Sequence, residues 1–204
     1  MTTPQHNLAV IKVVGIGGGG TNAIKRMIGE GMTGVDFIAL NTDEQDLLDC
    51  DAPTKLDIGQ STTRGLGAGA DPAVGERAAR DNSQDIEDVL TGADMVFVTA
   101  GEGGGTGTGG APIVAGIARG LGALTVAVVT KPFSFEGKRR ADNAEHGIEK
   151  LRDACDTLIT IPNDRLLQQE DKTISINEAF SKADEVLFNG VQGITDSSPL
   201  RDSL

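Results

Sequence analysis

The feature that most constrains this sequence is where its glycines fall. Glycine makes up 28 of the 204 residues, which is roughly twice its usual share. Dispersed or strictly periodic glycines would indicate a flexible or collagen-like chain. More than half of these glycines instead lie in three short segments, Gly15–Gly20, Gly65–Gly69 and Gly101–Gly110. Each segment borders a predicted strand or helix, so the glycines mark particular positions in a folded domain.

Apolar strands alternate with helices along the chain. Unbroken runs of Val, Ile, Leu and Phe indicate a sheet buried on both faces, and alternation with helices predicts right-handed crossovers between parallel strands. The predicted fold class is α/β, a doubly wound, mostly parallel sheet of about six strands with helices on both faces. Strands are predicted at residues 8–14, 37–40, 55–58, 95–99, 125–129 and 157–161. Helices are predicted at residues 22–28, 45–48, 72–90, 112–121 and 137–154, and from about residue 175 past residue 189.

The composition argues against several classes of protein. The formal charge is −12, and aromatic residues make up 3% of the chain. An acidic surface repels phosphate and few rings are present to stack on bases, so we expect no nucleic-acid partner. No apolar run approaches the roughly 20 residues of a membrane span, so we expect no direct membrane insertion. Cys50 and Cys155 lie far apart, without a CxxC motif, which favours a reducing cytoplasm over a disulfide framework or a zinc site.

The glycine segments predict where a ligand binds. In doubly wound sheets, ligands bind at the carboxyl ends of the strands, and Gly15–Gly20 and Gly101–Gly110 follow the first and fourth predicted strands. Backbone without Cβ atoms can approach a ligand closely. Amides at the start of a helix attract anions. Two such segments at one edge of a sheet would make a cradle for a polyphosphate.

The glycine segments match one of two common nucleotide-binding motifs. No GxxxxGK[ST] string occurs, which argues against a P-loop enzyme. Gly15, Gly17 and Gly20 match the GxGxxG dinucleotide fingerprint, and Asp43 follows near the position expected for a ribose contact. Any run of five glycines satisfies this pattern, however, and Asp43 is equally expected as a helix N-cap. An NAD-dependent oxidoreductase therefore remains an alternative. That alternative does not explain the string GGGTGTG at residues 103–109.

The GGGTGTG string resembles the signature of the tubulin/FtsZ superfamily of GTPases. The resemblance covers about residues 8–196 and is most similar to the N-terminal GTP-binding domain of the bacterial FtsZ branch, in its actinobacterial form. The other matching segments are Gly15–Asn22, Asn41–Asp43, Gly65–Pro72, Thr130–Arg140, Ile161–Leu167 and Ala183–Leu187. On this basis residues 9–174 are expected to form the GTP-binding domain, after a disordered extension over residues 1–8.

The resemblance implies a ligand and a site. The ligands would be GTP and GDP with Mg²⁺, and the magnesium ion would be held mainly through phosphates and water. Contacts to the phosphates are implied for Gly18, Gly19, Gly20, Thr21, Ala68, Gly69, Ala70, Gly104, Gly105, Thr106, Gly107 and Thr108. Other nucleotide contacts are implied for Asn22, Asp43, Thr130, Glu136, Arg140, Asn163, Phe180 and Asp184. Among these, Asn22, Asn163 and Asp184 would read the base and Phe180 would stack on it.

The resemblance also implies a biological role. The family member would act in the cytoplasm, at the division site at midcell, by polymerising head to tail into the division ring. The implied partners are a second copy of the chain or full-length FtsZ.

The last residues depart from the family pattern. FtsZ-like chains continue their central helix, begun here at residues 175–196, into an acidic loop, a second domain and a tail, whereas residues 197–204 match none of these. In the family, the acidic loop of one subunit positions the attacking water for the next. We therefore assign no catalytic residue, and expect weak hydrolysis and capping or poor copolymerisation by these 204 residues alone. Division-ring proteins that bind the family's tail are not expected here, and a regulator of full-length FtsZ is a further alternative.

Overall fold

The computed structural model describes residues 9–168 and 173–197. Six strands form one sheet in the order β3-β2-β1-β4-β5-β6, and every neighbouring pair is parallel. The strands are β1 Ile11–Ile16, β2 Asp36–Asn41, β3 Thr54–Asp57, β4 Met95–Gly101, β5 Leu124–Lys131 and β6 Thr157–Pro162. The predicted α/β fold is confirmed. The expected N-terminal extension and the tail after residue 197 lie outside the described residues.

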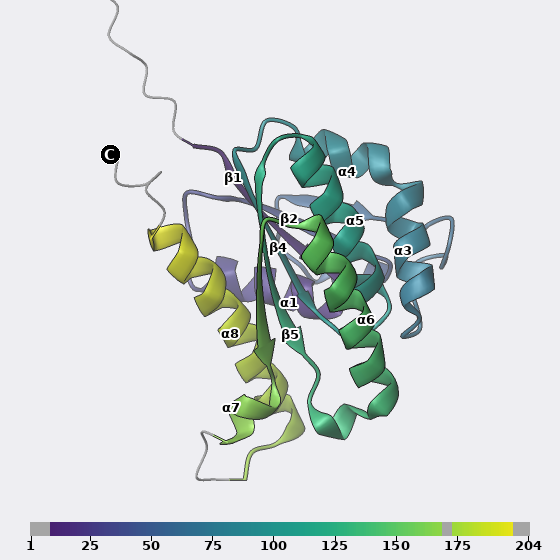
Figure 1. The fold of residues 1–204 in the computed structure, drawn as a ribbon, viewed down its shortest axis with the longest axis vertical. Helices are drawn as coiled ribbons and strands as arrows, with labels where there is room; N and C mark the ends of the chain where they lie inside the picture. Colours follow the sequence, from purple (N-terminus) through teal and green to yellow (C-terminus); the bar gives the residue numbers. More distant parts are fainter. Residues whose placement is uncertain (1–8, 169–172, 198–204) are drawn as a thin grey trace, which may run out of the picture.

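Helices cover both faces of the sheet (Figure 1). The helices are α1 Gly17–Gly29, α2 Glu44–Leu48, α3 Pro72–Asp81, α4 Ser83–Leu90, α5 Thr106–Gly120, α6 Lys138–Ala154, α7 Asp164–Gln168 and α8 Ile176–Ser197, with a 3-10 turn η1 at Ser134–Glu136. Helices α1, α2 and α8 pack on one face, and α3, α4, α5 and α6 pack on the other. None of these helices combines the length and the apolar character that spanning a membrane requires.

Alternation along the strands builds the two cores. Successive side chains of a strand point to opposite faces, so Val13 joins the core under α1 and α8 while Val14 joins the core under α3 to α6. Both side chains are fully buried. A sheet that buries both faces needs apolar residues at every position, which is why the strands were evident as unbroken Val, Ile, Leu and Phe runs.

The predicted helix over residues 72–90 is wrong as a single element, because Asn82 divides it into α3 and α4. The Asn82 backbone leaves helical geometry at φ −109° and ψ 20°. Its side-chain nitrogen donates to the carbonyls of Ala78, at 2.8 Å, and Ile58, at 3.1 Å. An asparagine amide that bonds nearby carbonyls competes with the helical ladder, so the chain turns at this residue.

The predicted start of the next helix at Pro112 is also wrong, because α5 already begins at Thr106 and contains Pro112. The early turn is helical although it is rich in glycine, and Gly109 N donates to Gly105 O at 3.1 Å. Close packing on α3 accounts for this. A Cβ built on Gly109 would lie 2.0 Å from Pro72 O, and one on Gly75 would lie 2.1 Å from Gly105 O. The glycines let two helix backbones touch, and that contact outweighs their low helix propensity.

Candidate functional site

A cavity of about 380 Å³ opens at the carboxyl edge of the sheet. It lies where the strand order reverses, because β2 and β3 extend to one side of β1 and β4 to β6 extend to the other. Ile16, the last residue of β1, pairs with Leu40 on one side and Ala100 on the other, so the strands end level with one another. This reversal is the position at which open α/β sheets bind ligands, and the volume suits a small organic molecule.

Two helix starts form the floor of the cavity. Neither α1 nor α5 has a side-chain cap or an acidic residue in its first turn, so their first amides keep the partial positive charge that attracts anions. The two starts are in backbone contact. A Cβ on Gly17 would lie 2.9 Å from Gly107 N of α5, and α1 also approaches the end of β4, where a Cβ on Gly19 would lie 3.1 Å from Gly101 N. Gly17 also has a φ of +73°, which favours glycine.

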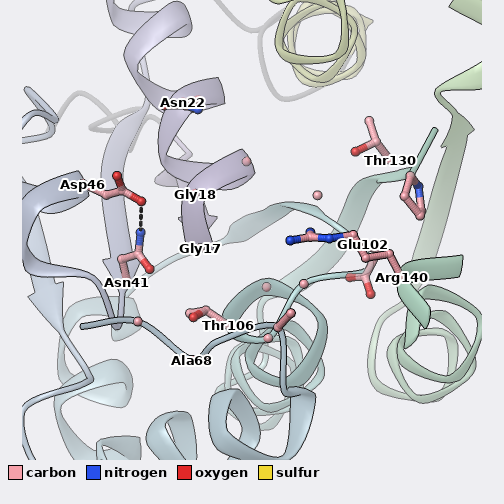
Figure 2. Close-up of a pocket in the computed structure, with 18 of the residues that line it drawn as sticks. Gly17, Gly18, Asn22, Asn41, Asp46, Ala68, Glu102, Thr106, Thr130 and Arg140 are labelled. Carbon is pink, nitrogen blue, oxygen red and sulfur yellow. Dashed lines mark hydrogen bonds between the residues drawn. The ribbon is translucent and has the colours of Figure 1, made fainter. Parts of the chain in front are cut away.

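Polar side chains line one end of the cavity, at residues 41–46. Asn41 donates its side-chain N–H to Asp46 at 3.2 Å (Figure 2). The Thr42 and Thr106 hydroxyls share a hydrogen bond of 2.6 Å. Asp43 caps α2 by accepting from Gln45 N at 2.9 Å, as the capping alternative predicted. Burial, and then the nearby charge of Asp43, raise the pKa of Asp46.

The α8 side of the cavity carries a different set of groups. Burial raises the pKa of Asp184 to about 6, against the opposing pull of Arg26 and Lys25, so its carboxyl is mostly ionised at pH 7. Asn163 is buried, and no partner for its side-chain oxygen is found among the described residues. The Phe180 ring meets that of Phe133 edge-on, with centroids 5.6 Å apart. Asp184, Asn163 and Phe180 all line the cavity, and they bring a carboxylate, an amide oxygen and an aromatic ring to it.

Arg140 supplies positive charge to the middle of this acidic molecule's cavity. Its guanidinium points into the cavity over the glycine floor (Figure 2). The nearest carboxylate partner is Glu136, with 3.9 Å between Nη1 and Oε1. The other Glu136 oxygen accepts from Phe133 N at 2.8 Å. The Arg140 side chain is 44% exposed, so it remains available to an incoming anion.

The sequence model of a known protein family matches most of this chain. The family model "Tubulin/FtsZ family, GTPase domain" covers residues 10–171. The chain belongs to the tubulin/FtsZ family.

Solved structures agree with this assignment. An empty FtsZ dimer from M. jannaschii is 49% identical, with a TM-score of 0.90, over 93% of this chain and 55% of that one. A W319Y mutant of the same FtsZ is 49% identical, with a TM-score of 0.88, over 91% and 56%. GDP-bound CetZ1 from Haloferax volcanii shares the fold at 24% identity and a TM-score of 0.79, over 88% and 58%. The chain thus spans a little over half the length of the structures it matches.

The cavity brings together all but three of the residues that resemblance to the tubulin/FtsZ family predicted for the site. Those that line it are Gly18, Gly19, Asn22, Asp43, Ala68, Gly69, Ala70, Gly104, Gly105, Thr106, Gly107, Thr130, Glu136, Arg140, Asn163, Phe180 and Asp184. Gly20, Thr21 and Thr108 lie outside the lining.

These three residues shape the floor from beneath. Thr21 donates its hydroxyl to Gly18 O at 3.1 Å, and the Thr108 hydroxyl accepts from Gly103 N at 2.8 Å. A Cβ on Gly20 would lie 2.6 Å from Thr99 O. The two hydroxyls thus bond to the backbone of the floor, and the absence of a side chain at Gly20 lets the floor pack closely on β4.

Some lining residues were not among the predicted set. They are Gly17, Asn41, Thr42, Asp46, Gly67, Gly101, Glu102, Pro132, Ala183 and Leu187. Asn41 and Thr42 lie in a segment already matched to the tubulin/FtsZ family, so the sequence contains the information that would place them in the site. Leu187 likewise ends a matched segment, Ala183–Leu187. Asp46 lies in none of the matched segments and carries an ordinary helix-surface pattern, so only the fold brings it to the cavity.

Glu102 is the least expected of these residues, because it is a carboxyl inside a glycine-rich anion site. It is 4% exposed, and neither side-chain oxygen has a partner among the described residues. Burial raises its pKa to about 8, so it is mainly neutral at pH 7. A Cβ on Gly147 of α6 would lie 2.6 Å from its Oε2. The neutral carboxyl therefore fills the space between the floor and α6 without adding a charge that would repel an anion.

Proposed function

We propose that this chain binds GTP and GDP in the cavity at the carboxyl edge of the sheet. The observation that carries the proposal is the pair of uncapped helix starts that meet backbone to backbone on the cavity floor. A polyphosphate is the ligand that such a floor suits, because its charges are spread along a chain that both helix ends can face. Membership of a family of GTPase domains supports this choice.

The two ends of the cavity fix the direction of the nucleotide in this proposal. The base would lie at the α8 end, where Asp184, ionised at neutral pH, can accept from guanine N1–H and N2–H₂. Adenine offers no such donor pair, so selectivity for guanine follows. The phosphates would then cross the floor toward Ala68, which lies at the opposite end from α8 in Figure 2. The terminal phosphate would contact the backbone of residues 68–70.

Magnesium fits the phosphate end of this proposal through oxygen ligands alone. The carboxylates of Asp43 and Asp46 and the hydroxyl of Thr42 line that end, and Mg²⁺ is usually held by one or two carboxylates, phosphates and water. No group of three or more His, Cys, Asp or Glu side chains spaced to hold a metal occurs among the described residues. When bound, the ion would neutralise charge on the phosphate oxygens. Asp43 and Asp46 would orient its water shell.

The assembly and the role of the chain are part of the same proposal. We propose head-to-tail association with a second copy or with full-length FtsZ, and we propose that a full-length neighbour completes GTP hydrolysis. An FtsZ dimer and a CetZ2 protofilament with bound GTPγS are among the solved structures of this fold. The proposed setting is the division site at midcell in the bacterial cytoplasm. A regulator that binds full-length FtsZ through one face is the second candidate, and co-sedimentation with FtsZ filaments would favour it.

Calorimetric titration with GTP, GDP, ATP and NAD, with and without Mg²⁺, tests the binding proposal. We expect GTP and GDP to bind at least tenfold more tightly than ATP or NAD, and Mg²⁺ to strengthen GTP binding. Arg140→Ala is expected to weaken both guanine nucleotides by about tenfold, the usual effect of losing a charged hydrogen bond. Arg152→Ala, an exposed change on the same helix, is the matched control. Tighter binding of NAD than of GTP would favour the oxidoreductase alternative and overturn the proposal.

A further inference from the structure

The segment that ends beside the phosphate floor has an unusual backbone. Five of the seven residues 64–70 have positive φ, between +53° for Arg64 and +86° for Gly67. Ala70, at +60°, is not glycine, so its Cβ makes this conformation costly. A segment of this kind does not hold its shape by local preference alone. Contacts from other parts of the molecule must fix it.

One side of the segment is fixed by backbone contacts with the residues after β2. Gly67 N donates to Thr42 O at 3.1 Å, and Gly65 O accepts from Glu44 N at 3.1 Å. These bonds secure the first half of the segment. They do not reach Ala68, Gly69 or Ala70, which line the cavity where the terminal phosphate is proposed to lie.

The other side is held by a turn bond from Asp71 N to Ala68 O, at 3.1 Å, and by one side chain of α6. The Asn143 side-chain nitrogen donates to Ala70 O at 3.2 Å and to Gly103 O at 3.3 Å. Its two N–H groups thus join the end of the segment to the glycine-rich turn that precedes α5. Asn143 is half-buried and does not line the cavity, so it would act through these two carbonyls.

The two loops that Asn143 joins are already in contact. A Cβ on Gly105 would lie 2.6 Å from the Ala68 Cβ and 2.9 Å from Asp71 N. Asn143 also lies one helical turn after Arg140, so α6 presents both side chains toward Gly103, whose Cβ position lies 2.9 Å from Arg140 O. A small change at Asn143 would therefore alter the spacing between the 68–70 backbone and the floor.

We propose that Asn143 is a positioning residue that sets the distance between residues 68–70 and the phosphate floor, and so determines how strongly the site prefers a third phosphate. The inference rests on the proposed function, because it takes GTP and GDP as the ligands. Without the amide bridge, residues 68–70 relax away from the floor. The terminal phosphate of GTP then loses contacts that GDP never makes.

The test compares GDP with GTPγS, which avoids turnover during the titration. Asn143→Ala removes the bridge but keeps a strong helix former, and Asn143→Leu removes it while keeping most of the volume. We expect either variant to weaken GTPγS binding by about fivefold, close to the effect of one neutral hydrogen bond. GDP affinity should stay within about twofold.

Asn82→Leu is the matched control, because Asn82 also bridges two carbonyls, but outside the cavity lining. It should lower the melting temperature and leave the ratio of the GDP and GTPγS dissociation constants unchanged. The inference would be overturned if both Asn143 variants kept the ratio of the two dissociation constants unchanged, whether neither nucleotide lost affinity or both lost it equally. If the unaltered chain bound neither nucleotide, the proposed function itself would fail, and the two results are thus distinguishable.

Discussion

At the scale of single residues, Glu102 links the chemistry of the site to the stability of the fold. Its ordinary pKa is 4.5, and burial raises this to about 8. Between these two values the folded chain holds a proton that the unfolded chain has released. The free energy of unfolding therefore falls as the pH rises through this window, and the loss is complete above pH 8.

Glu102→Met should remove this penalty, because the thioether fills a similar space without an ionisable group. We expect the stability advantage of the variant over the unaltered chain to grow by several kcal/mol between pH 5 and pH 8, because each unit by which the pKa is raised corresponds to about 1.4 kcal/mol. The difference should shrink toward pH 5. Urea unfolding at several pH values measures it. Glu149→Met, an exposed change on α6, should show no such trend, and a pH-independent difference for Glu102→Met would contradict the assignment.

How much of the site the sequence predicts also depends on single residues. Glycines at strand ends and the GGGTGTG string predict the position of the floor, because backbones that approach this closely require glycine. The hydroxyls of Thr21 and Thr108 bond to the floor's own backbone, and the contacts to phosphate implied for these two residues stay a prediction. A threonine among glycines suits both roles, and only coordinates separate them. Asn143 left no signal, since a polar residue on an amphipathic helix is ordinary.

At the scale of elements, the contact between α3 and α5 depends on glycine. A Cβ on Gly109 would lie 2.0 Å from Pro72 O, whereas one on Gly116, in the same helix, meets nothing within 4 Å. Gly109→Ala should therefore push the helices apart and destabilise the fold by several kcal/mol, as other overpacked backbone contacts do. Gly116→Ala should stabilise it by about 0.5–1 kcal/mol. Thermal unfolding of both variants decides this, and equal shifts would contradict it.

Elements differ in how well the sequence predicts them, because some depend on burial alone and others depend on contacts with distant residues. Strands that bury both faces were predicted because each position is constrained in the same way, so the apolar run is continuous. The division at Asn82 and the early start of α5 depend on partners distant in sequence, Ile58 O in the first case and Pro72 O in the second. Local propensity contains neither contact. A prediction from local propensity therefore joins α3 and α4 into one helix and starts α5 too late.

At the scale of the whole molecule, the proposed hydrolysis needs a full-length neighbour. We expect these 204 residues, assayed by themselves, to bind GTP and to release phosphate slowly, because the proposed hydrolysis is completed by that neighbour. The rate per molecule should not change with protein concentration, because copies of this sequence would not complete one another's sites. Phosphate release over a tenfold or wider concentration range measures this. A rate per molecule that rises with concentration, together with sedimenting polymers, would contradict it.

The backbone contact between α1 and α5 has a consequence for the way a ligand enters and leaves. Gly17 of α1 meets the backbone of Gly107 in α5, and Gly19 of α1 meets the backbone of Gly101 at the end of β4, so the floor cannot widen without breaking the junction of two buried strands and two helices. Exchange of the ligand must then proceed by opening of the walls, on the side of residues 68–70 or of α8. Amide hydrogens of the buried strands beneath the floor should exchange with solvent slowly whether or not a ligand is bound, and those of the walls should respond to it.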